Sequence, residues 1–337
     1  MKKAVFLGEQ SNVDQVYSAE TITSLTTVLE FPCGTKVFDK TELAYIDLKD
    51  ISFVFSTWGM CELNETEIVR FLPKVEAVFY AAGSVQRFAR PFLKKGIRVF
   101  SAWGANGAAV AEFTLAQIIL AGKGYFNLIH TPGLPKEKEW YLRKREVSYT
   151  GNYDNTIGII GAGMIGRLVI EKIHQVLEHT RILVFDPFMS QEKADMLGVE
   201  LCDLKKLFSE SDVISNHLAN NAQTVGILNG QLFDCMKPWA VFINTGRGAQ
   251  VVEADLIQAL KNVPSRAALL DVTFPEPASE DSELYQMKNV FLSPHIAGSL
   301  GNEVRRMGEY MLDEYSRYAN GLSLRYEVTI EMLETMA

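Results

Sequence analysis

The stretch Thr156-Ile157-Gly158-Ile159-Ile160-Gly161-Ala162-Gly163-Met164-Ile165-Gly166 decides the fold of this chain. Its first half is an apolar, β-branched run, typical of a strand buried on both faces, and residues 164–177 continue with apolar positions at helical spacing. In the G-x-G-x-x-G pattern, Gly161 permits a tight turn, Gly163 lets the backbone approach a pyrophosphate, and Gly166 lets the helix pack close to the strand. The stretch therefore predicts a strand–turn–helix unit that binds a dinucleotide.

The residues after this turn indicate which dinucleotide is bound. Met164 and Ile165 open the expected helix, whose free N–H groups and positive dipole end favour phosphates. Asp186 lies 20 residues after Gly166, at the end of the next expected strand. A carboxylate there accepts hydrogen bonds from the adenosine ribose and repels a 2′-phosphate, which predicts NAD, with NADP as the alternative. The structural alternative is a glycine-rich turn followed by a surface aspartate.

The same strand–helix alternation extends over most of the chain and predicts an α/β fold with parallel sheets covered by helices on both faces. The expected strands are residues 4–7, 51–56, 77–81, 99–101, 156–160, 182–185, 213–216, 240–244, 267–271 and 290–292. The expected helices include residues 66–71, 108–121, 164–177, 254–260 and 303–318.

Length and composition limit the class of protein. The chain has 337 residues, 47% of them hydrophobic, which is enough for two domains with buried cores. Its net charge of −8 gives no general attraction to nucleic acid or to an anionic membrane, so neither is an expected partner. The apolar stretch 108–122 is interrupted by Glu112 and is shorter than the about 20 residues that a membrane span needs, so we expect a core helix.

The cysteines and the N-terminus indicate a cytoplasmic protein. The four cysteines form no CxxC motif and no Cys/His cluster, which argues against a disulfide framework and against a metal site. The apolar run after Lys2 and Lys3 is too short for a signal peptide and is expected to be the first strand. Residues 131–155 combine prolines, a glycine and charge clusters, which predicts an internal boundary or an arm that contacts a second subunit.

Three residues after successive expected strands form a candidate catalytic set, because ligands of parallel sheets gather at the carboxyl ends of strands. Arg247 is a cation that can bind a carboxylate bidentately. Glu276 lies between two prolines, and His295 follows the last expected strand. An imidazole exchanges a proton with a substrate oxygen, and a neighbouring carboxylate orients it. Each residue alone also has a structural alternative: a surface ion pair, a rigid turn and a core histidine.

Together these motifs resemble those of the D-isomer-specific 2-hydroxyacid dehydrogenases. The resemblance rests on residues 110–112 (VAE), 158–166 (GIIGAGMIG), 243–248 (INTGRG), 270–277 (LDVTFPEP) and 293–298 (SPHIAG). It implies two Rossmann-like or flavodoxin-like domains with the active site in the interdomain cleft. The substrate domain would comprise residues 1–104 and 299–337, and residues 105–298 would form the NAD-binding domain and carry the interface of a homodimer.

The resemblance also implies roles for the site residues. Arg247 would bind the substrate, His295 would be the acid/base and Glu276 its partner. A hydride would pass between nicotinamide C4 and C2 of a D-2-hydroxyacid or 2-ketoacid. Asp271 would lie near the nicotinamide amide, and Thr245, Gly246 and Arg247 would line the nicotinamide side. His217 follows an expected strand and either touches the cofactor or packs in the core. The turn Ala82-Gly83-Ser84 would offer backbone N–H groups to the substrate carboxylate.

Two departures from the family pattern limit what can be transferred. The usual H-x-P reads His217-Leu218-Ala219, and the usual G-V-D-like substrate turn reads Gly83-Ser84-Val85-Gln86, so substrate identity does not carry over. No regulatory domain is expected after residue 337. The alternative function is an NAD(H)-sensing binding protein, as in the eukaryotic corepressors built on the same scaffold, because the fold does not fix the function.

Overall fold

The computed structural model describes residues 1–129 and 150–334, and these divide into two compact units. Unit 1 comprises Met1–Ala109 and Ser299–Ala337, and unit 2 comprises Val110–Gly298. The first boundary therefore lies inside a helix, five residues later than the sequence-based boundary at 104/105. Most of the expected arm at 131–155 lies outside the described residues.

Unit 1 contains a six-stranded sheet with the order β13-β5-β4-β3-β1-β2 among the described residues. Strands β1 to β5 are parallel in the order 2-1-3-4-5, which is the flavodoxin-like arrangement. The edge strand β13 is antiparallel to β5, an exception to the expected all-parallel sheet. The elements are β1 (Ala4–Leu7), α1 (Gln10–Val16), α2 (Ala19–Val28), β2 (Val37–Phe38), η1 (Glu42–Ala44), β3 (Phe53–Ser56), α3 (Glu65–Phe71), β4 (Ala77–Tyr80), α4 (Ala89–Lys94), β5 (Arg98–Ser101), α13 (Glu303–Ala319), β13 (Glu327–Val328) and η4 (Met332–Glu334).

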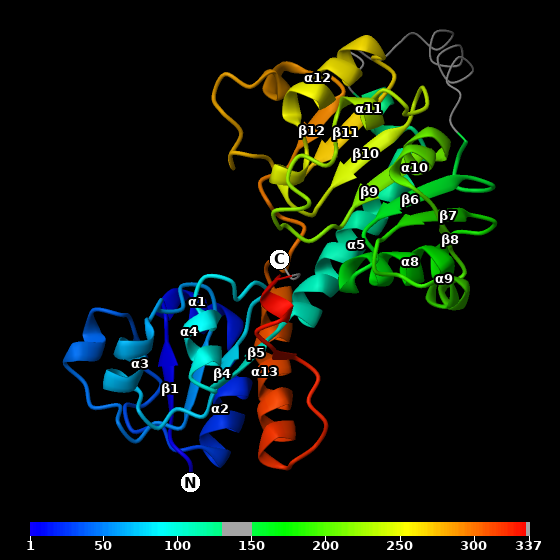
Figure 1. Cartoon of the computed structure of the whole chain (residues 1–337). Coiled ribbons are helices and arrows are strands. Elements are labelled where there is room, and N and C mark those ends of the chain that lie inside the picture. The colour runs from blue at the N-terminus through cyan, green and yellow to red at the C-terminus, as the bar shows by residue number, and fades with distance from the viewer. Residues whose placement is uncertain (130–149, 335–337) are drawn as a thin grey trace. The chain divides into compact units, whose positions relative to one another are not determined.

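A row of aromatic side chains forms the centre of unit 1. Phe6, Phe55, Phe79 and Phe100 are paired in register across β1, β3, β4 and β5. The ring centroids of Phe55 and Phe79 are 5.1 Å apart, and those of Phe79 and Phe100 are 4.8 Å apart. Tyr315 of α13 meets this row edge-on, with its centroid 5.6 Å from that of Phe79. Large buried rings in these geometries stabilise the sheet and fix α13 against it (Figure 1).

Unit 2 contains a seven-stranded sheet with the order β12-β11-β10-β9-β6-β7-β8, all parallel in the described residues. Counted from β6, the order 3-2-1-4-5-6-7 is that of the Rossmann fold extended by one strand. The elements are α5 (Trp103–Gly122, which begins in unit 1), α6 (Tyr125–Ile129), β6 (Thr156–Ile160), α8 (Met164–Val176), β7 (Arg181–Phe185), α9 (Gln191–Leu197), β8 (Glu200–Leu201), α10 (Leu204–Glu210), β9 (Val213–Asn216), α11 (Gly230–Phe233), β10 (Val241–Asn244), η2 (Gly248–Gln250), α12 (Glu253–Asn262), β11 (Ala267–Leu270), η3 (Glu283–Gln286) and β12 (Val290–Leu292).

Helices cover both faces of this sheet, which confirms the predicted fold class (Figure 1). Alternate residues of β6 point to opposite faces: Ile159 packs in the cluster that includes α5 and α8, and Ile160 packs in the cluster that includes α10 and α12. The continuous apolar runs in the sequence therefore reflect burial on both sides.

Helix α5 is, among the described helices, the one that is long and apolar enough to cross a membrane. Its residues Ala111, Thr114, Ile118 and Ala121 are, however, buried inside unit 2. A helix that buries a whole side against a sheet behaves as a core helix, as the sequence predicts.

Candidate active site

The glycine-rich turn follows β6, where the strand order of unit 2 reverses and ligands of Rossmann folds bind. Gly161 has a φ of +85°, and an added Cβ would lie 2.9 Å from the carbonyl oxygen of His217. A Cβ at Gly166 would lie 2.1 Å from the carbonyl oxygen of Gly161. At Gly163 an added Cβ would meet no described atom within 4 Å. The turn therefore admits only glycine at its two closed positions and leaves open space at the third, which fits a pyrophosphate.

The groups around this turn also suit a dinucleotide. Helix α8 begins at Met164 after Gly163, and no side chain caps its first N–H groups. Asp186 follows β7, and its two carboxylate oxygens each accept a 2.8 Å hydrogen bond, from the N–H of Ala162 and from that of Phe188. The carboxylate is thereby fixed beside the glycine turn, as a ribose contact requires.

His217 follows β9 at the same edge of the sheet. Its Nε2 lies 2.9 Å from Ser215 Oγ, and its Nδ1 is buried without a hydrogen-bond partner among the described residues. Burial lowers the pKa of His217 to about 4, so the ring is neutral at pH 7. A neutral ring with one free nitrogen can contact an uncharged polar group, so both alternatives stated for His217 from the sequence stay open.

The candidate catalytic residues follow three adjacent parallel strands, β10, β11 and β12. His295 Nδ1 lies 2.5 Å from Glu276 Oε1, and the two side chains are 47% and 41% exposed. The Nε2 atom of His295 has no hydrogen-bond partner in the described part of the chain. The structure therefore joins these two residues as a carboxylate–imidazole pair with one ring nitrogen available to a substrate.

Asp271 holds the loop that carries His295. Its buried carboxylate accepts hydrogen bonds from Ser293 Oγ at 2.6 Å and from the N–H groups of Ile296 and Ala297 at 2.9 Å. His295 itself has a φ of +54°, and its N–H donates to the Asp271 carbonyl at 3.0 Å. Asp271 thus has a positioning role that the sequence did not indicate, and its contact with the nicotinamide stays a prediction.

Arg247 provides a partly buried cation on the neighbouring loop. Its Nη1 donates to the Gly246 carbonyl at 2.7 Å, and no carboxylate lies within 4.0 Å of it among residues 1–129 and 150–334. Burial lowers the pKa of Arg247, and the charge of Glu276 opposes this shift. A Cβ at Gly248 would lie 2.0 Å from the backbone of Thr273, so this loop packs directly on the segment that leads to Glu276. An unpaired guanidinium in such a place favours an anionic ligand.

In unit 1, the predicted substrate turn Ala82–Ser84 follows β4. Ser101 Oγ donates to the carbonyls of Ala82 and Gly83 at 2.8 and 2.5 Å. The N–H groups of Gly83 and Ser84 donate to no protein acceptor among the described residues. Asn106, which the sequence analysis missed, lies beside them: a Cβ at Gly83 would be 3.4 Å from its Nδ2. The Asn106 Oδ1 accepts from the N–H of Ser299 at 2.9 Å, which orients the amide.

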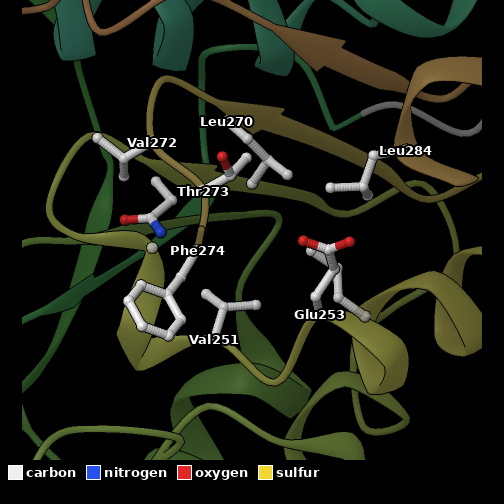
Figure 2. Close-up of a pocket in the computed structure, with 10 residues that line it drawn as sticks. Val251, Glu253, Leu270, Val272, Thr273, Phe274 and Leu284 are labelled. Atoms are coloured by element: carbon white, nitrogen blue, oxygen red, sulfur yellow. The ribbon is translucent and has the colours of Figure 1, made fainter. Parts of the chain in front are cut away.

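A small pocket lies where the loops after β10 and β11 meet α12, and none of the three candidate catalytic side chains lines it. Figure 2 shows mostly apolar lining side chains, with Glu253 as the labelled carboxylate; Glu253 Oε1 accepts from Ser282 Oγ at 2.6 Å. An apolar space of this kind is a packing region behind the loops rather than a site for a polar acid. Its lining residues are Asn244, Gly248, Val251, Glu253, Leu256, Leu270, Val272, Thr273, Phe274 and Leu284.

No group of three or more His, Cys, Asp or Glu residues could hold a metal ion in the described parts of the chain.

Thr245 is buried, and its Oγ1 lies 3.0 Å from that of Thr114. The three buried amides next to it, Asn216, Asn244 and Gln250, were also missed by the sequence analysis. The contacts that join them, Asn216 with Asn244 and Asn216 with Gln250, span 28 and 34 residues, so no local pattern could have revealed the cluster.

The sequence of this chain is similar to those of known dehydrogenases. Residues 127–297 match the model of the D-isomer specific 2-hydroxyacid dehydrogenase, NAD binding domain. A D-3-phosphoglycerate dehydrogenase of Archaeoglobus fulgidus is 31% identical over 81% of this chain and 55% of its own length. A glyoxylate reductase of Korarchaeum cryptofilum is 29% identical over 76% of this chain and 77% of its own length. The chain covers 36% to 59% of the length of the first three curated relatives that it matches.

Solved structures share the fold over nearly the whole chain. A phosphoglycerate oxidoreductase from Rhizobium etli has a TM-score of 0.78 at 20% identity, covering 99% of this chain and 100% of the other. Identity at this level supports the fold alone.

Proposed function

The chain belongs to the D-isomer-specific 2-hydroxyacid dehydrogenase family, and we propose that it is an NAD-dependent oxidoreductase that interconverts a D-2-hydroxyacid and its 2-ketoacid. The observation that carries the proposal is the 2.5 Å contact between His295 and Glu276, with unpaired Arg247 on the adjacent strand end. His295 supplies the proton, Glu276 orients the imidazole that carries it, and Arg247 binds the substrate anion. Apart from the hydride, these are the three contributions that the reduction of a ketoacid requires.

His295 is the proposed acid/base. Because Glu276 accepts the Nδ1 proton, Nε2 is the atom that exchanges a proton with the oxygen on C2 of the substrate. The Glu276 carboxylate keeps the ring oriented toward the substrate oxygen.

Arg247 is the proposed anchor for the substrate acid. A planar guanidinium binds a carboxylate bidentately, and in its partly buried position this contact is stronger than in water. For unit 1, we assign Ala82, Gly83 and Ser84 to the substrate. The N–H groups of Gly83 and Ser84, which meet no acceptor among the described residues, support the assignment, whereas the Ala82 N–H donates to the Tyr80 carbonyl at 2.9 Å and would not contribute.

The cofactor would be held by the backbone of Gly161, Gly163, Met164, Ile165 and Gly166 at the pyrophosphate. When bound, the nicotinamide supplies the hydride exchanged with C2. The fixed carboxylate of Asp186 supports NAD over NADP, because it repels a 2′-phosphate. The further proposed contacts on the nicotinamide side are His217, Thr245, Gly246 and Asp271.

We further propose a cytoplasmic homodimer. Cys33, Cys61, Cys202 and Cys235 are free, as in a reducing compartment. Exposed apolar side chains on α5 and α6, such as Leu120 and Tyr125, are the kind of surface that a second subunit covers.

The test is the loss of NADH absorbance with a panel of 2-ketoacids: glyoxylate, hydroxypyruvate, pyruvate and longer acids. His295→Ala should lower kcat by about 10²–10⁴ and retain NADH binding, because it removes only the proton transfer. His179→Ala, at an exposed histidine remote from the set, is the control and should keep wild-type turnover. Equal rates in wild type and His295→Ala would overturn the catalytic assignment. NADH binding without turnover of any acid would favour the NAD(H)-sensing alternative.

A further inference from the structure

Three amide side chains that the proposed mechanism does not use are fully buried beneath the site loops. Asn216 ends β9, Asn244 ends β10 and Gln250 ends η2, and each is 0% exposed. We call them the amide cluster. Burying a primary amide is unfavourable unless its donors and acceptors are paired. Three buried amides at one sheet edge must therefore find hydrogen-bond partners there.

One side of the amide cluster holds the backbone of the Arg247 loop. Asn244 Nδ2 donates to the Arg247 carbonyl at 3.1 Å, and the N–H of Gly246 donates to Asn244 Oδ1 at 3.1 Å. Asn216 Nδ2 donates to the same Oδ1 at 3.1 Å. A Cβ at Gly246 would lie 3.2 Å from Asn216 Nδ2, so this loop packs against the cluster with no space to slide.

The other side of the amide cluster holds the loop beside the glycine turn. Asn216 Nδ2 donates to Gln250 Oε1 at 2.6 Å, and Gln250 Nε2 donates to the carbonyls of Leu218 and Ala219 at 2.8 and 2.9 Å. This backbone is in turn the nearest neighbour of Gly161, whose Cβ would meet the His217 carbonyl at 2.9 Å. A continuous chain of contacts therefore runs from the pyrophosphate turn to Arg247.

Such a chain transmits a change in one loop to the other, because the amides cannot move singly. Displacing Leu218 and Ala219 would leave the Gln250 donors unpaired in a buried place, which is unfavourable. The hydrogen bonds of the whole network therefore oppose the displacement of one loop alone.

From this connection we propose that the amide cluster positions Arg247 according to the state of the 217–219 loop, so that NADH binding raises the affinity for the 2-ketoacid. Asn216, Asn244 and Gln250 are positioning residues in this scheme. The inference rests on the proposed function, because it assumes that NADH and a ketoacid bind to this chain.

The experiment measures binding rather than turnover. Oxamate, an unreactive analogue of a 2-ketoacid, is titrated by calorimetry into the full chain with and without saturating NADH. We expect NADH to tighten oxamate binding in the wild type by about tenfold or more, within the usual range of coupling. Gln250→Met has a similar shape and no donors, and it should reduce this factor at least about threefold while NADH affinity changes less than about twofold.

The matched control is Asn155→Leu, which removes another buried amide of unit 2. Asn155 is 1% exposed and accepts from Thr180 Oγ1 at 2.7 Å, just before β6 and outside the amide cluster. It should lower stability and keep the wild-type coupling factor. Asn216→Ser, which removes both central hydrogen bonds and keeps a polar atom, replaces Gln250→Met if that variant does not fold.

Four results would overturn the inference. An unchanged coupling factor in Gln250→Met, or an equal loss in Asn155→Leu, shows that the amide cluster does not transmit the effect. Oxamate binding that is independent of NADH in the wild type removes the coupling and leaves the proposed function standing. Absence of NADH binding in the wild type contradicts the proposed function itself, and the inference falls with it.

Discussion

The carboxyl edges of the two sheets use their polar groups in different ways. In unit 1 the buried hydroxyls face inward to backbone carbonyls: Tyr17 Oη donates to Ser56 at 3.0 Å, and Thr57 Oγ1 donates to Ala81 at 2.7 Å. Ser101 does the same for the Ala82–Ser84 turn. This edge therefore offers backbone N–H groups and no titratable side chain of its own in the turn.

In unit 2 the same kind of edge carries charge. Arg247, Glu276 and His295 project from loops after three adjacent strands, and buried carboxylate and amide groups hold those loops from below. The difference shows that a parallel sheet supplies only the place for a site, and that the chemistry depends on the loop side chains and on what fixes them.

The largest loss of activity is expected when Arg247, the cation at the carboxyl edge of the unit 2 sheet, is replaced. Arg247→Gln should lower kcat/KM for the best ketoacid by about 10³, or about 4 kcal/mol, because a substrate carboxylate loses a charged bidentate partner. NADH affinity should change little. Steady-state kinetics and NADH titration measure the two effects.

Arg266→Gln is the matched control, since Arg266 is also buried in unit 2 but donates to the Asp234 and Met236 carbonyls. It should lower the melting temperature and keep kcat/KM. If the two arginine variants behave alike, the loss at Arg247 is structural and the contrast between the edges is wrong.

His217 should make the stability of unit 2 sensitive to acid. Its pKa is about 4 in the folded chain against 6.5 in the unfolded chain, so between these values the unfolded state binds more protons. Stability is therefore unaffected above pH 6.5, falls as the pH drops toward 4, and the full loss is about 3 kcal/mol. Urea unfolding at pH 7 and pH 5 should show a smaller loss in His217→Gln, by about 2 kcal/mol. An equal loss in both proteins would mean that His217 is readily protonated in the folded chain.

A substitution at Asp186 tests how the carboxyl edge of unit 2 selects its cofactor. Asp186→Ala removes the charge that repels a 2′-phosphate, so the ratio of kcat/KM for NADPH to that for NADH should rise about tenfold, or about 1.4 kcal/mol. The comparison uses one ketoacid at fixed concentration. A constant ratio would show that Asp186 serves only the turn, through Ala162 and Phe188.

The unit 1 edge should give the smallest effect, because its groups act through the backbone. Ser101→Ala releases two carbonyls and should raise KM for the ketoacid about fivefold, corresponding to about 1 kcal/mol, with kcat unchanged. A loss in kcat instead would contradict the passive role assigned to this edge.

Much of the fold could be predicted from local patterns. The strands at 4–7, 156–160, 213–216 and 290–292 have the predicted bounds, because buried parallel strands are continuous apolar runs between turn residues. The two-residue strands β2, β8 and β13 were not predicted, since two residues carry no periodicity. Only pairing with a neighbour makes them strands.

The sequence by itself determined the glycine turn, the carboxylate of Asp186 and the identity of Arg247, Glu276 and His295, because these depend on residue type at short spacing. The tertiary structure decided what each group touches: the 2.5 Å contact of His295 with Glu276, the loop donors on Asp271, the neutral ring of His217 and the amide cluster. Their partners come from segments separated by up to 34 residues in the chain. Burial and hydrogen-bond geometry exist only after the sheet has brought those segments together, so no local pattern contains them.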